Sequence, residues 1–462
     1  MNFLTGKWKW LLGITVMLAV ALYSSIPAFS APSIPLRGVV EGFYGTPWSQ
    51  ADRLSMLKFC HDHKLNAYIY APKDDAYHRA KWREMYPADK MAELKALIDE
   101  SKKQQVKFIF AVSPGLDIHF AGQEAEQDKQ AMQAKLTAMY DMGVRDFAIF
   151  FDDIKNKDGK GQAEFLNWVN ANFIAQHADI NPLIAVPTEY FRQDMESEGQ
   201  IKKYTKDFSS TLDKDILVLY TGEKVVPDGL RDIDYVRANK LYGRQLGIWW
   251  NYPVSDYLEA KLALGPVEKL PATAAIPAIF YNPMKHAELS KISLATGAEY
   301  ALNPGKYNAG KAWHKAIKAQ YGSLAADMEA FADQSQHMVV SWAVIGPEDG
   351  AALRRQMDAY WQNPNDESRK KLLADLSKLD QSIVKLQAKL PQNILKECQP
   401  QLEQLQRIVR ADMLGLQVLA GEKTKADFDR AFAEVKAHEK EALISEKAAW
   451  AFMDELLQHI NK

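Results

Sequence analysis

Two adjacent aspartates are the residues of this sequence best suited to chemistry. Asp152 and Asp153 directly follow the apolar run 147–151, so a carboxylate leaves a dry segment at the point where that segment ends. Burial and a neighbouring carboxylate favour one ionised and one protonated group. Acid/base cleavage of a glycosidic bond requires that combination. The alternative interpretation is structural, either a helix N-cap or a salt-bridged strand end.

The geometry of a β-strand sets a condition on this pair of acids. Successive side chains of a strand point to opposite faces of the sheet. If 147–151 is a strand, the chain must therefore bend at Asp152 and Asp153 for both carboxylates to serve one substrate.

Polar and aromatic residues also follow the other apolar runs in the first 300 residues. These segments are Glu41 to Gly45, Lys73 to Asp75, Ser113 to Asp117, Thr188 to Tyr190, Thr221-Gly222, Asn251 with Asp256, and Tyr281-Asn282. Carboxylates, amides and a lysine suit the hydroxyl groups of a sugar, and aromatic surface suits the faces of its ring. The Lys-Asp-Asp segment at 73–75 is alternatively a solvated turn.

A metal site is the rival use of such acids. None of the ten histidines forms a His-Glu-x-x-His motif, and none lies within three residues of Asp152 and Asp153. The segment 60–63 is Cys-His-Asp-His, but it falls inside a predicted helix where only Cys60 and His63 share a face. We interpret it as a surface turn, and we expect neither a metal nor a cofactor.

Eight short runs rich in Val, Ile, Phe and Tyr alternate with amphipathic segments, which indicates repeated βα units. We predict strands at 38–41, 67–70, 107–112, 147–151, 183–186, 216–220, 246–250 and 276–280. Eight parallel strands close a barrel whose active site lies at the strand ends, and about 250 residues is a typical span. The predicted fold is an α/β (β/α)8, or TIM, barrel. A doubly wound open sheet is the competing arrangement, although its Gly-rich turn is missing.

Helix signals lie between the strands and dominate the last third of the chain. Thr46-Pro47 is an N-cap candidate, Pro87 starts a second helix, and 127–142 and 161–177 form two more. After residue 305 the strand pattern stops and leucines recur every three or four residues, which predicts an all-α helical bundle. The predicted division is a signal peptide at 1–30, a catalytic barrel at 31–305 and a helical domain at 306–462.

The first thirty residues are typical of a secretory signal. Two lysines precede the uncharged apolar stretch 11–22, and the small residues 28–30 follow it. We expect cleavage after Ser30 or Ala31 and export to the periplasm or the medium. Twelve apolar residues are short for a membrane span, which favours a cleaved signal, and an uncleaved membrane anchor is the alternative.

Composition excludes several classes of protein. The 462 residues carry 57 Lys plus Arg against 59 Asp plus Glu, so no excess of positive charge is present to bind nucleic acid. Charged residues at 25% and apolar residues at 47% argue against a disordered chain and a multi-span membrane protein. Cys60 and Cys398, the two cysteines, imply no disulfide framework.

Five segments, in order along the chain, resemble one known family. They are GVVEGFYG at 38–45, YAPKDD at 70–75, SPGLD at 113–117, FFDDI at 150–154 and PTEY at 187–190. Together they resemble glycoside hydrolase family 84, the β-N-acetylglucosaminidases that include protein O-GlcNAcases and enzymes historically called hyaluronidases. The resemblance extends firmly over residues 36–305 and loosely over the helical domain.

The resemblance implies a retaining hydrolysis in which the 2-acetamido oxygen of the substrate attacks the anomeric carbon. Asp152 would hold the acetamido N–H and stabilise the oxazoline intermediate. Asp153 would protonate the leaving oxygen and then activate water. Tyr190 matches the family tyrosine that donates to the acetamido oxygen.

The resemblance also implies further sugar-binding positions. Those that would contact sugar hydroxyls are Gly42, Lys73, Asp256 and Asn282. Asn251 matches an asparagine that supports the carboxylates and the acetamido group. Trp249 matches an aromatic residue that lines the pocket, and core packing is its alternative role.

The implied activity is that of an exo-β-N-acetylglucosaminidase acting on a glycan or glycoprotein that bears N-acetylglucosamine. A hyaluronidase-type polysaccharide hydrolase is one alternative, and the scarcity of Lys and Arg at the strand exits disfavours a long anionic polymer. A secreted carbohydrate-binding protein that does not turn over its ligand is the other alternative.

Overall fold

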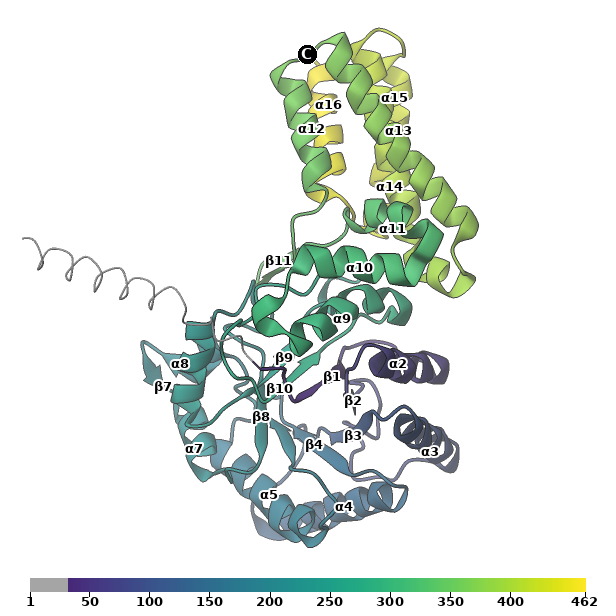
Figure 1. The fold of residues 1–462 in the computed structure, drawn as a ribbon. Helices are drawn as coiled ribbons and strands as arrows, with labels where there is room; N and C mark the ends of the chain where they lie inside the picture. Colours follow the sequence, from purple (N-terminus) through teal and green to yellow (C-terminus); the bar gives the residue numbers. More distant parts are fainter. Residues whose placement is uncertain (1–31) are drawn as a thin grey trace, which may run out of the picture.

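The computed structural model describes residues 32–462 (Figure 1). The predicted signal peptide at 1–30 and the residue after it lie outside the described residues. Within 32–462, no helix has both the length and the apolar character that a bilayer crossing requires.

Eight parallel strands form a closed barrel in the lower part of the view in Figure 1. They are β1 (Leu36–Glu41), β2 (Ala67–Tyr70), β3 (Lys107–Val112), β4 (Asp146–Phe150), β5 (Ile184–Val186), β8 (Leu217–Tyr220), β9 (Gly247–Trp250) and β10 (Ala278–Tyr281). The order around the barrel is β1-β10-β9-β8-β5-β4-β3-β2, so the first and last strands pair and no edge remains. The predicted (β/α)8 barrel is confirmed, and every predicted strand overlaps an observed one.

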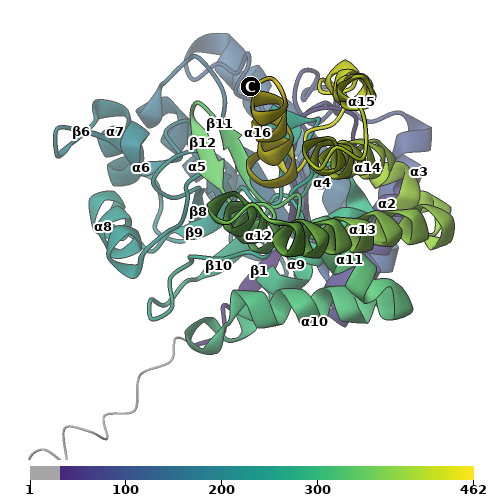
Figure 2. The same cartoon turned by 90° about the horizontal axis from the view of Figure 1, so that it is seen from above.

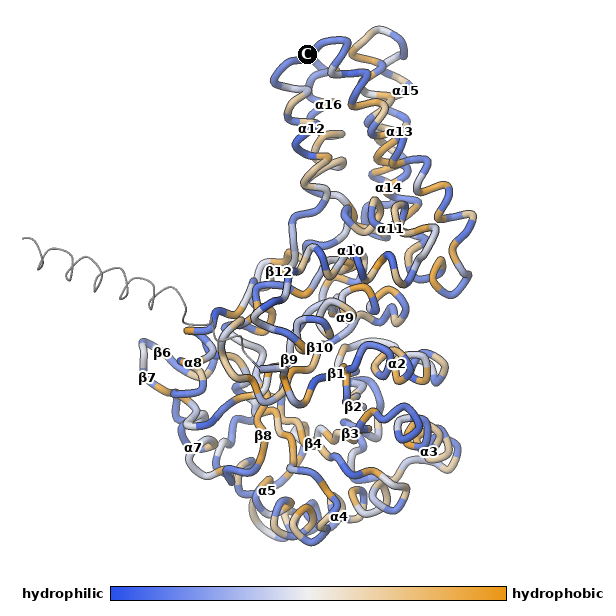
Figure 3. The backbone as a smooth tube through the Cα atoms, in the orientation of Figure 1, coloured by the Kyte–Doolittle hydropathy of each residue, from blue (hydrophilic) through white to orange (hydrophobic). Residues whose placement is uncertain are grey.

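The barrel has an inner and an outer apolar layer, because strand residues alternate in direction. In β4, Ala148 and Phe150 belong to the cluster that fills the barrel interior. Phe147 and Ile149 belong to the larger cluster between the sheet and the surrounding helices. Both faces of the strands are thus buried, and Figure 3 shows these segments as largely hydrophobic.

Helices surround the barrel between successive strands. They are α2 (Gln50–Asp62), α3 (Ala88–Lys103), α4 (Gly122–Asp141), α5 (Gly159–Asn172), α6 (Arg192–Met195), α7 (Lys203–Thr211), α8 (Asp232–Tyr242) and α9 (Ala287–Leu302), with a small hairpin of β6 (Glu196–Ser197) and β7 (Gln200–Ile201) after α6. The predicted cap of the first helix is wrong. Ser49, not Thr46, caps α2, because Ser49 and Asp52 form a reciprocal capping box.

The chain after α9 is mainly helical and projects from the barrel as a bundle, which Figure 2 shows from its far end. Its helices are α10 (Ala309–Tyr321), α11 (Ala325–Ala332), α12 (Ala351–Gln362), α13 (Asp366–Lys389), α14 (Gln392–Leu419), α15 (Lys425–Ala437) and α16 (Ala451–Ile460), the last preceded by a π-helical turn, η5 (Glu446–Trp450). An antiparallel hairpin, β11 (Met338–Val340) and β12 (Ala343–Ile345), interrupts them. The predicted helical region is confirmed, whereas the domain boundary at residue 305 stays a prediction.

The bundle is joined to the barrel by specific polar contacts. The carboxylate of Glu397 on α14 accepts hydrogen bonds from the backbone N–H groups of Glu288 and Leu289, at 3.1 and 2.8 Å, in the first turn of α9. Burial raises the pKa of Glu397 to about 7. A side chain of the bundle therefore supplies the N-terminal acceptor that the last barrel helix needs.

The bundle contains one buried aspartate that is unfavourable for the stability of the folded state. Asp412 on α14 is fully buried, and neither carboxylate oxygen has a hydrogen-bond partner among the described residues. Burial, reinforced by Glu455 and Asp454, raises its pKa well above the ordinary value. An unpaired buried polar group of this kind destabilises the folded state.

We therefore expect Asp412→Ala to raise the free energy of unfolding by about 1–2 kcal/mol near neutral pH. A carboxyl whose folded-state pKa is raised loses stability as pH rises above its unfolded pKa of about 3.9, so the advantage of the variant grows from acid to neutral pH. Thermal unfolding of the parent and of the variant, at an acidic and at a neutral pH, measures this difference in stability. Asp429→Ala, an exposed aspartate on α15, is the control with little change. A variant less stable than the parent at neutral pH would contradict the interpretation.

Candidate active site

A cavity of about 440 Å³ opens at the carboxyl ends of the barrel strands. All nine residues singled out from the sequence line it, namely Gly42, Lys73, Asp152, Asp153, Tyr190, Trp249, Asn251, Asp256 and Asn282. They come from the exits of six strands, which meet at one face because the strands are parallel and the barrel is closed.

The chain bends at the aspartate pair, as the strand geometry requires. β4 ends at Phe150, which faces the barrel interior, so alternation directs Asp152 inward and would direct Asp153 outward. Asp153 instead has a φ of +56°, in the left-handed region that non-glycine residues seldom occupy. This conformation lets the second carboxylate line the same cavity as the first.

Asp152 is ion-paired on one side and unpartnered on the other. Oδ2 of Asp152 accepts a hydrogen bond from Nζ of Lys73, whose side chain is 2% exposed. Oδ1 is buried and has no hydrogen-bond partner among the described residues. A buried carboxylate oxygen without a donor is costly, so the arrangement favours a ligand that brings an N–H or O–H to this atom.

Asp153 receives two tyrosine hydroxyl groups. Tyr190 donates to Oδ1 and Tyr44 donates to Oδ2, each at 2.8 Å. Burial and then Asp153 itself raise the pKa of both tyrosines far above the ordinary value, so both hydroxyls remain protonated donors. Tyr44 was not singled out from the sequence, although it lies in the segment that follows the first predicted strand.

The guanidinium of Arg79 contacts Tyr44 and the backbone at Asp153. Its Nη1 donates to the Tyr44 hydroxyl at 3.2 Å, and its Nη2 donates to the carbonyl oxygen of Asp153 at 3.3 Å. Arg79 therefore bridges the strand-one exit and the bend after β4. Its position outside the strand-exit segments explains why the sequence pattern did not indicate it.

Asn251 holds other cavity residues rather than the aspartates. Its Oδ1 accepts from Nε1 of Trp249 at 2.8 Å and from Nδ2 of Asn282 at 3.0 Å. Its own amide donates to the carbonyl oxygen of Val225 at 2.9 Å. Asn251 thus fixes the indole of Trp249 and the side-chain amide of Asn282. Oδ1 of Asn282 has no hydrogen-bond partner among the described residues.

Trp249 forms the inner wall of the cavity and requires a glycine opposite it. A Cβ at Gly42 would meet ring atoms of Trp249 at 2.4 and 2.6 Å, closer than any real contact. Trp249 belongs to the apolar cluster of the barrel interior and packs edge-on against Phe150 at a centroid distance of 5.5 Å. It therefore serves both roles considered for it, as core residue and as cavity wall.

Asp256 lies at the rim of the cavity. Its carboxylate accepts a hydrogen bond from the backbone N–H of Tyr44 at 2.8 Å. Burial, opposed by that hydrogen bond, raises the pKa of Asp256. The contact links the exits of β1 and β9 across the mouth of the site.

The outer rim contains aromatic and apolar residues that sequence reasoning missed. Among them are Val225, Val226, Val254, Tyr257 and Trp342. The rings of Tyr257 and Trp342 lie 5.1 Å apart, and Trp342 comes from the turn between β11 and β12. No local pattern connects this hairpin with the barrel, so only the folded structure could reveal its contribution.

The Cys60 to His63 segment is not part of this cavity. The expected surface turn is wrong, because the segment is the last turn of α2 with Cys60 buried in the core. Burial raises the pKa of the Cys60 thiol to about 12, and the rings of His63 and Phe59 lie 4.2 Å apart. Within residues 32–462, no group of three or more His, Cys, Asp or Glu side chains is arranged to hold a metal ion.

The closed barrel and its carboxylate-lined, sugar-sized cavity place the chain in the class of (β/α)8-barrel glycoside hydrolases. A family profile described as beta-N-acetylglucosaminidase matches residues 37–333, and one described as hyaluronidase post-catalytic domain-like matches residues 352–453. The chain belongs to this β-N-acetylglucosaminidase family, glycoside hydrolase family 84, as its sequence motifs indicated.

Relatives and solved structures agree with that assignment. The proteins named Protein O-GlcNAcase of Rattus norvegicus and Mus musculus are each 33% identical over 275 residues, which is 57% of this chain and 30% of theirs. The chain thus spans less than a third of the length of these relatives. The structure of CpGH84B has a TM-score of 0.85 and 38% identity, covering 92% of this chain and 77% of that one. A variant of the Thermobaculum terrenum O-GlcNAc hydrolase has a TM-score of 0.79 and 25% identity, covering 92% and 95%.

The contact between Gly42 and Trp249 generates a prediction. Gly42→Ala should displace the indole into the cavity and lower kcat/KM on an aryl N-acetyl-β-glucosaminide by about 10²-fold, because a misplacement of about 1 Å in a site has that effect. Adding Trp249→Phe, which removes the clashing ring atoms, should restore part of the loss. Gly310→Ala on α10, where a Cβ would meet only Oδ1 of Asn308 at an ordinary contact distance of 3.8 Å, is the control. An unchanged kcat/KM in the Gly42→Ala variant would contradict the prediction, because it would show that the Trp249 indole can move without loss of activity.

Proposed function

We propose that the protein is a retaining exo-β-N-acetylglucosaminidase that uses the acetamido group of its substrate as the nucleophile. The observation that carries the proposal is the unpartnered Oδ1 of Asp152 beside a second carboxylate that faces the same cavity. An N-acetylglucosamine residue would bring an amide N–H to that oxygen. The cavity of about 440 Å³ falls in the usual range for a small-ligand site.

The proposed first step breaks the glycosidic bond. Asp152 accepts the acetamido N–H and directs the acetamido oxygen to the anomeric carbon. As that C–O bond forms, Asp153 gives its proton to the leaving oxygen and the glycosidic bond breaks. The positive charge of the resulting oxazolinium ion lies next to Asp152, whose ion pair with Lys73 keeps it in place.

The proposed second step regenerates the enzyme. Asp153, now ionised, removes a proton from water, whose oxygen attacks the anomeric carbon from the face that the leaving group occupied. The oxazoline opens, the acetamido group reforms, and the sugar leaves with its original anomeric configuration. Two displacements give retention of configuration.

The remaining cavity residues are proposed to orient the sugar. Trp249 would pack against the ring and the acetamido methyl group, and Lys73, Asp256 and Asn282 would contact hydroxyl groups. Tyr190, which donates to Asp153 without a ligand, would donate to the acetamido oxygen when the substrate is bound. Backbone at Gly42 would approach the sugar closely because no side chain intervenes.

A neutral, terminal sugar suits the charges of the cavity better than an anionic polymer does. Lys73 is the sole basic side chain among the described residues that line it, and Asp152 already neutralises Lys73. We therefore favour a neutral glycan or glycoprotein bearing terminal N-acetylglucosamine over hyaluronan-type chains. The relatives named Protein O-GlcNAcase support this choice of substrate class.

We also propose that the chain is exported through its N-terminal segment, on the strength of the signal-like pattern in residues 1–30. Expression of the full chain in a bacterium should yield an extracytoplasmic protein that begins at Ala31 or Pro32. Amino-terminal sequencing of the fractionated protein measures this. Recovery of the full chain in the membrane fraction would instead support the uncleaved anchor.

Substitution of the two aspartates should separate their roles. Asp153→Asn should lower kcat/KM by about 10²–10⁴-fold on a phenyl N-acetyl-β-glucosaminide and much less on a dinitrophenyl analogue, whose leaving group needs little acid assistance. Asp152→Asn should lower activity by about 10²–10³-fold on both substrates, because the intermediate still needs its charge stabilised. Steady-state kinetics on the substrate pair measures both effects.

Asp141→Asn, an exposed aspartate at the end of α4, is the control and should match the parent. Equal losses on the two substrates in the Asp153 variant would contradict the acid assignment. A fully active Asp152 variant would contradict assistance by the acetamido group.

A further inference from the structure

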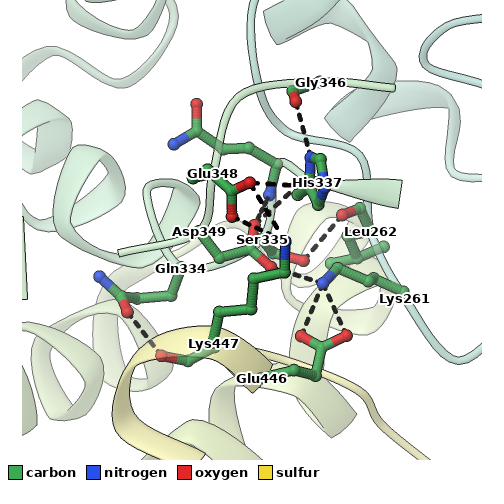
Figure 4. Close-up of polar contacts among 12 residues, drawn as sticks. Lys261, Leu262, Gln334, Ser335, His337, Gly346, Glu348, Asp349, Glu446 and Lys447 are labelled. Atoms are coloured by element: carbon green, nitrogen blue, oxygen red, sulfur yellow. Dashed lines mark hydrogen bonds and ion pairs between the residues drawn. The ribbon is translucent and has the colours of Figure 1, made fainter. Parts of the chain in front are cut away.

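A buried lysine outside the catalytic cavity joins three segments that are far apart in the sequence (Figure 4). Nζ of Lys261 lies 2.5 Å from Oδ2 of Asp349 and 2.6 and 2.7 Å from the two carboxylate oxygens of Glu446. The Lys261 side chain is 3% exposed, as is that of Asp349. We call these three residues the ionic latch.

Each member of the latch comes from a different part of the fold. Lys261 lies in the loop after β9, shortly after the short helix η2 (Asp256–Leu258) that carries Asp256 and Tyr257. Asp349 follows β12, at the base of the β11–β12 hairpin, and Glu446 begins the π-helical turn η5 of the bundle. The latch therefore connects the active-site loop, the hairpin and the C-terminal helices.

Asp349 also fixes the base of the hairpin directly. Its second oxygen, Oδ1, accepts hydrogen bonds from the backbone N–H groups of Gln336 and His337 at 2.6 and 2.8 Å. Nδ1 of His337 lies 2.7 Å from the carbonyl oxygen of Gly346, which joins the two ends of the hairpin. Ser335 donates from Oγ to the carbonyl oxygen of Leu262 at 2.7 Å, beside Lys261.

The C-terminal segment packs against the same two partners through its backbone. The N–H of Ser445 donates to the carbonyl oxygen of Gln334 at 2.8 Å, and the N–H of Leu443 donates to that of Ala260 at 2.9 Å. Glu446 thus approaches Lys261 from a segment that is itself attached to both the hairpin and the loop. Since a buried lysine strongly requires its carboxylate partners, the three segments are held in one arrangement.

The ends of the two segments held by the latch meet at the rim of the catalytic cavity. Tyr257 projects from the loop and Trp342 from the tip of the hairpin, and both line the cavity with their rings 5.1 Å apart. Trp342 is 49% exposed, so packing around its own side chain holds it only in part. Its position depends on the base of the hairpin, where the latch lies.

We propose that the ionic latch positions the Tyr257–Trp342 pair, so that the helical bundle contributes to recognition of the group that leaves from the sugar. Lys261, Asp349 and Glu446 are positioning residues, because they lie behind the rim and do not line the cavity. The effect of the latch on recognition of the leaving group rests on the proposed function. The effect of the latch on the position of the β11–β12 hairpin is independent of the proposed function.

Glu446→Gln tests the latch with little change of shape. Glu348→Gln is the matched control, because Glu348 also joins the hairpin segment to η5, through Lys447 at 3.1 Å, but is 56% exposed and does not contact Lys261. Hydrogen exchange of the backbone amides in 338–345 should become faster in the Glu446 variant and stay unchanged in the Glu348 variant. Asp349→Asn, which retains an acceptor for the backbone amides, is the second latch variant and should also accelerate exchange.

Kinetics test the functional consequence. In Glu446→Gln, KM for an aryl N-acetyl-β-glucosaminide should rise about three- to ten-fold, the size expected for coupled side chains. The inhibition constant of free N-acetylglucosamine, which lacks a leaving group, should not change. Trp342→Ala should give the same pattern, and the double variant should show less than the product of the two single effects, because both act through one aromatic contact.

Three results would overturn the proposal. They are unchanged exchange in the hairpin of both latch variants, equal changes in KM and in the inhibition constant, and multiplicative effects in the double variant. Absence of turnover by the parent protein would instead refute the proposed function, and the exchange comparison would still decide whether the latch holds the hairpin.

Discussion

The left-handed bend at Asp153 is the constraint on which the site depends. Without it, the alternation of β4 would direct adjacent carboxylates to opposite faces of the sheet. A non-glycine residue pays about 1–2 kcal/mol for such a conformation. Two tyrosine hydroxyls donate to the Asp153 carboxyl group, and these hydrogen bonds offset part of that cost. The positive φ of one residue, Asp153, thereby brings two carboxyl groups with different hydrogen-bond partners into one cavity.

The barrel makes this bend useful, because the groups that stabilise the two acids come from different strands. Lys73 follows β2 and ion-pairs with Asp152, whereas Tyr44 follows β1 and Tyr190 follows β5. These segments are distant in sequence, and they converge because a closed parallel sheet brings every carboxyl end to one face. No local segment of the chain could assemble the same environment, since Asp152 and Asp153 themselves bring no donors.

The difference between local patterns and contacts of residues distant in sequence explains how much could be predicted from the sequence. Alternation of apolar runs is a local signal, so the eight strands and the polar residues at their ends were predictable, and the nine residues chosen from the motifs share one cavity. Trp342 was missed because it reaches the rim from a hairpin beyond the barrel, which no periodicity connects to the strands. The cap of α2 was misplaced because Thr46-Pro47 is a favourable start in isolation, whereas the reciprocal pair of Ser49 and Asp52 satisfies two backbone donors.

The helical region also has to be understood together with the barrel. Glu397 supplies acceptors to the first turn of α9, the side-chain amide of Gln401 donates to the carbonyl oxygen of Ala260, and Glu446 neutralises the buried Lys261. The first contact supplies acceptors for backbone groups at the start of α9, and the other two add a further partner to barrel groups that also bind Leu443 and Asp349. Removing the bundle would therefore expose apolar surface, leave a helix end of the barrel uncompensated and take away one of the two carboxylates that pair with Lys261. Because Lys261 and Ala260 belong to the loop that carries Asp256 and Tyr257, the stability of the bundle and the geometry of the catalytic rim are physically coupled.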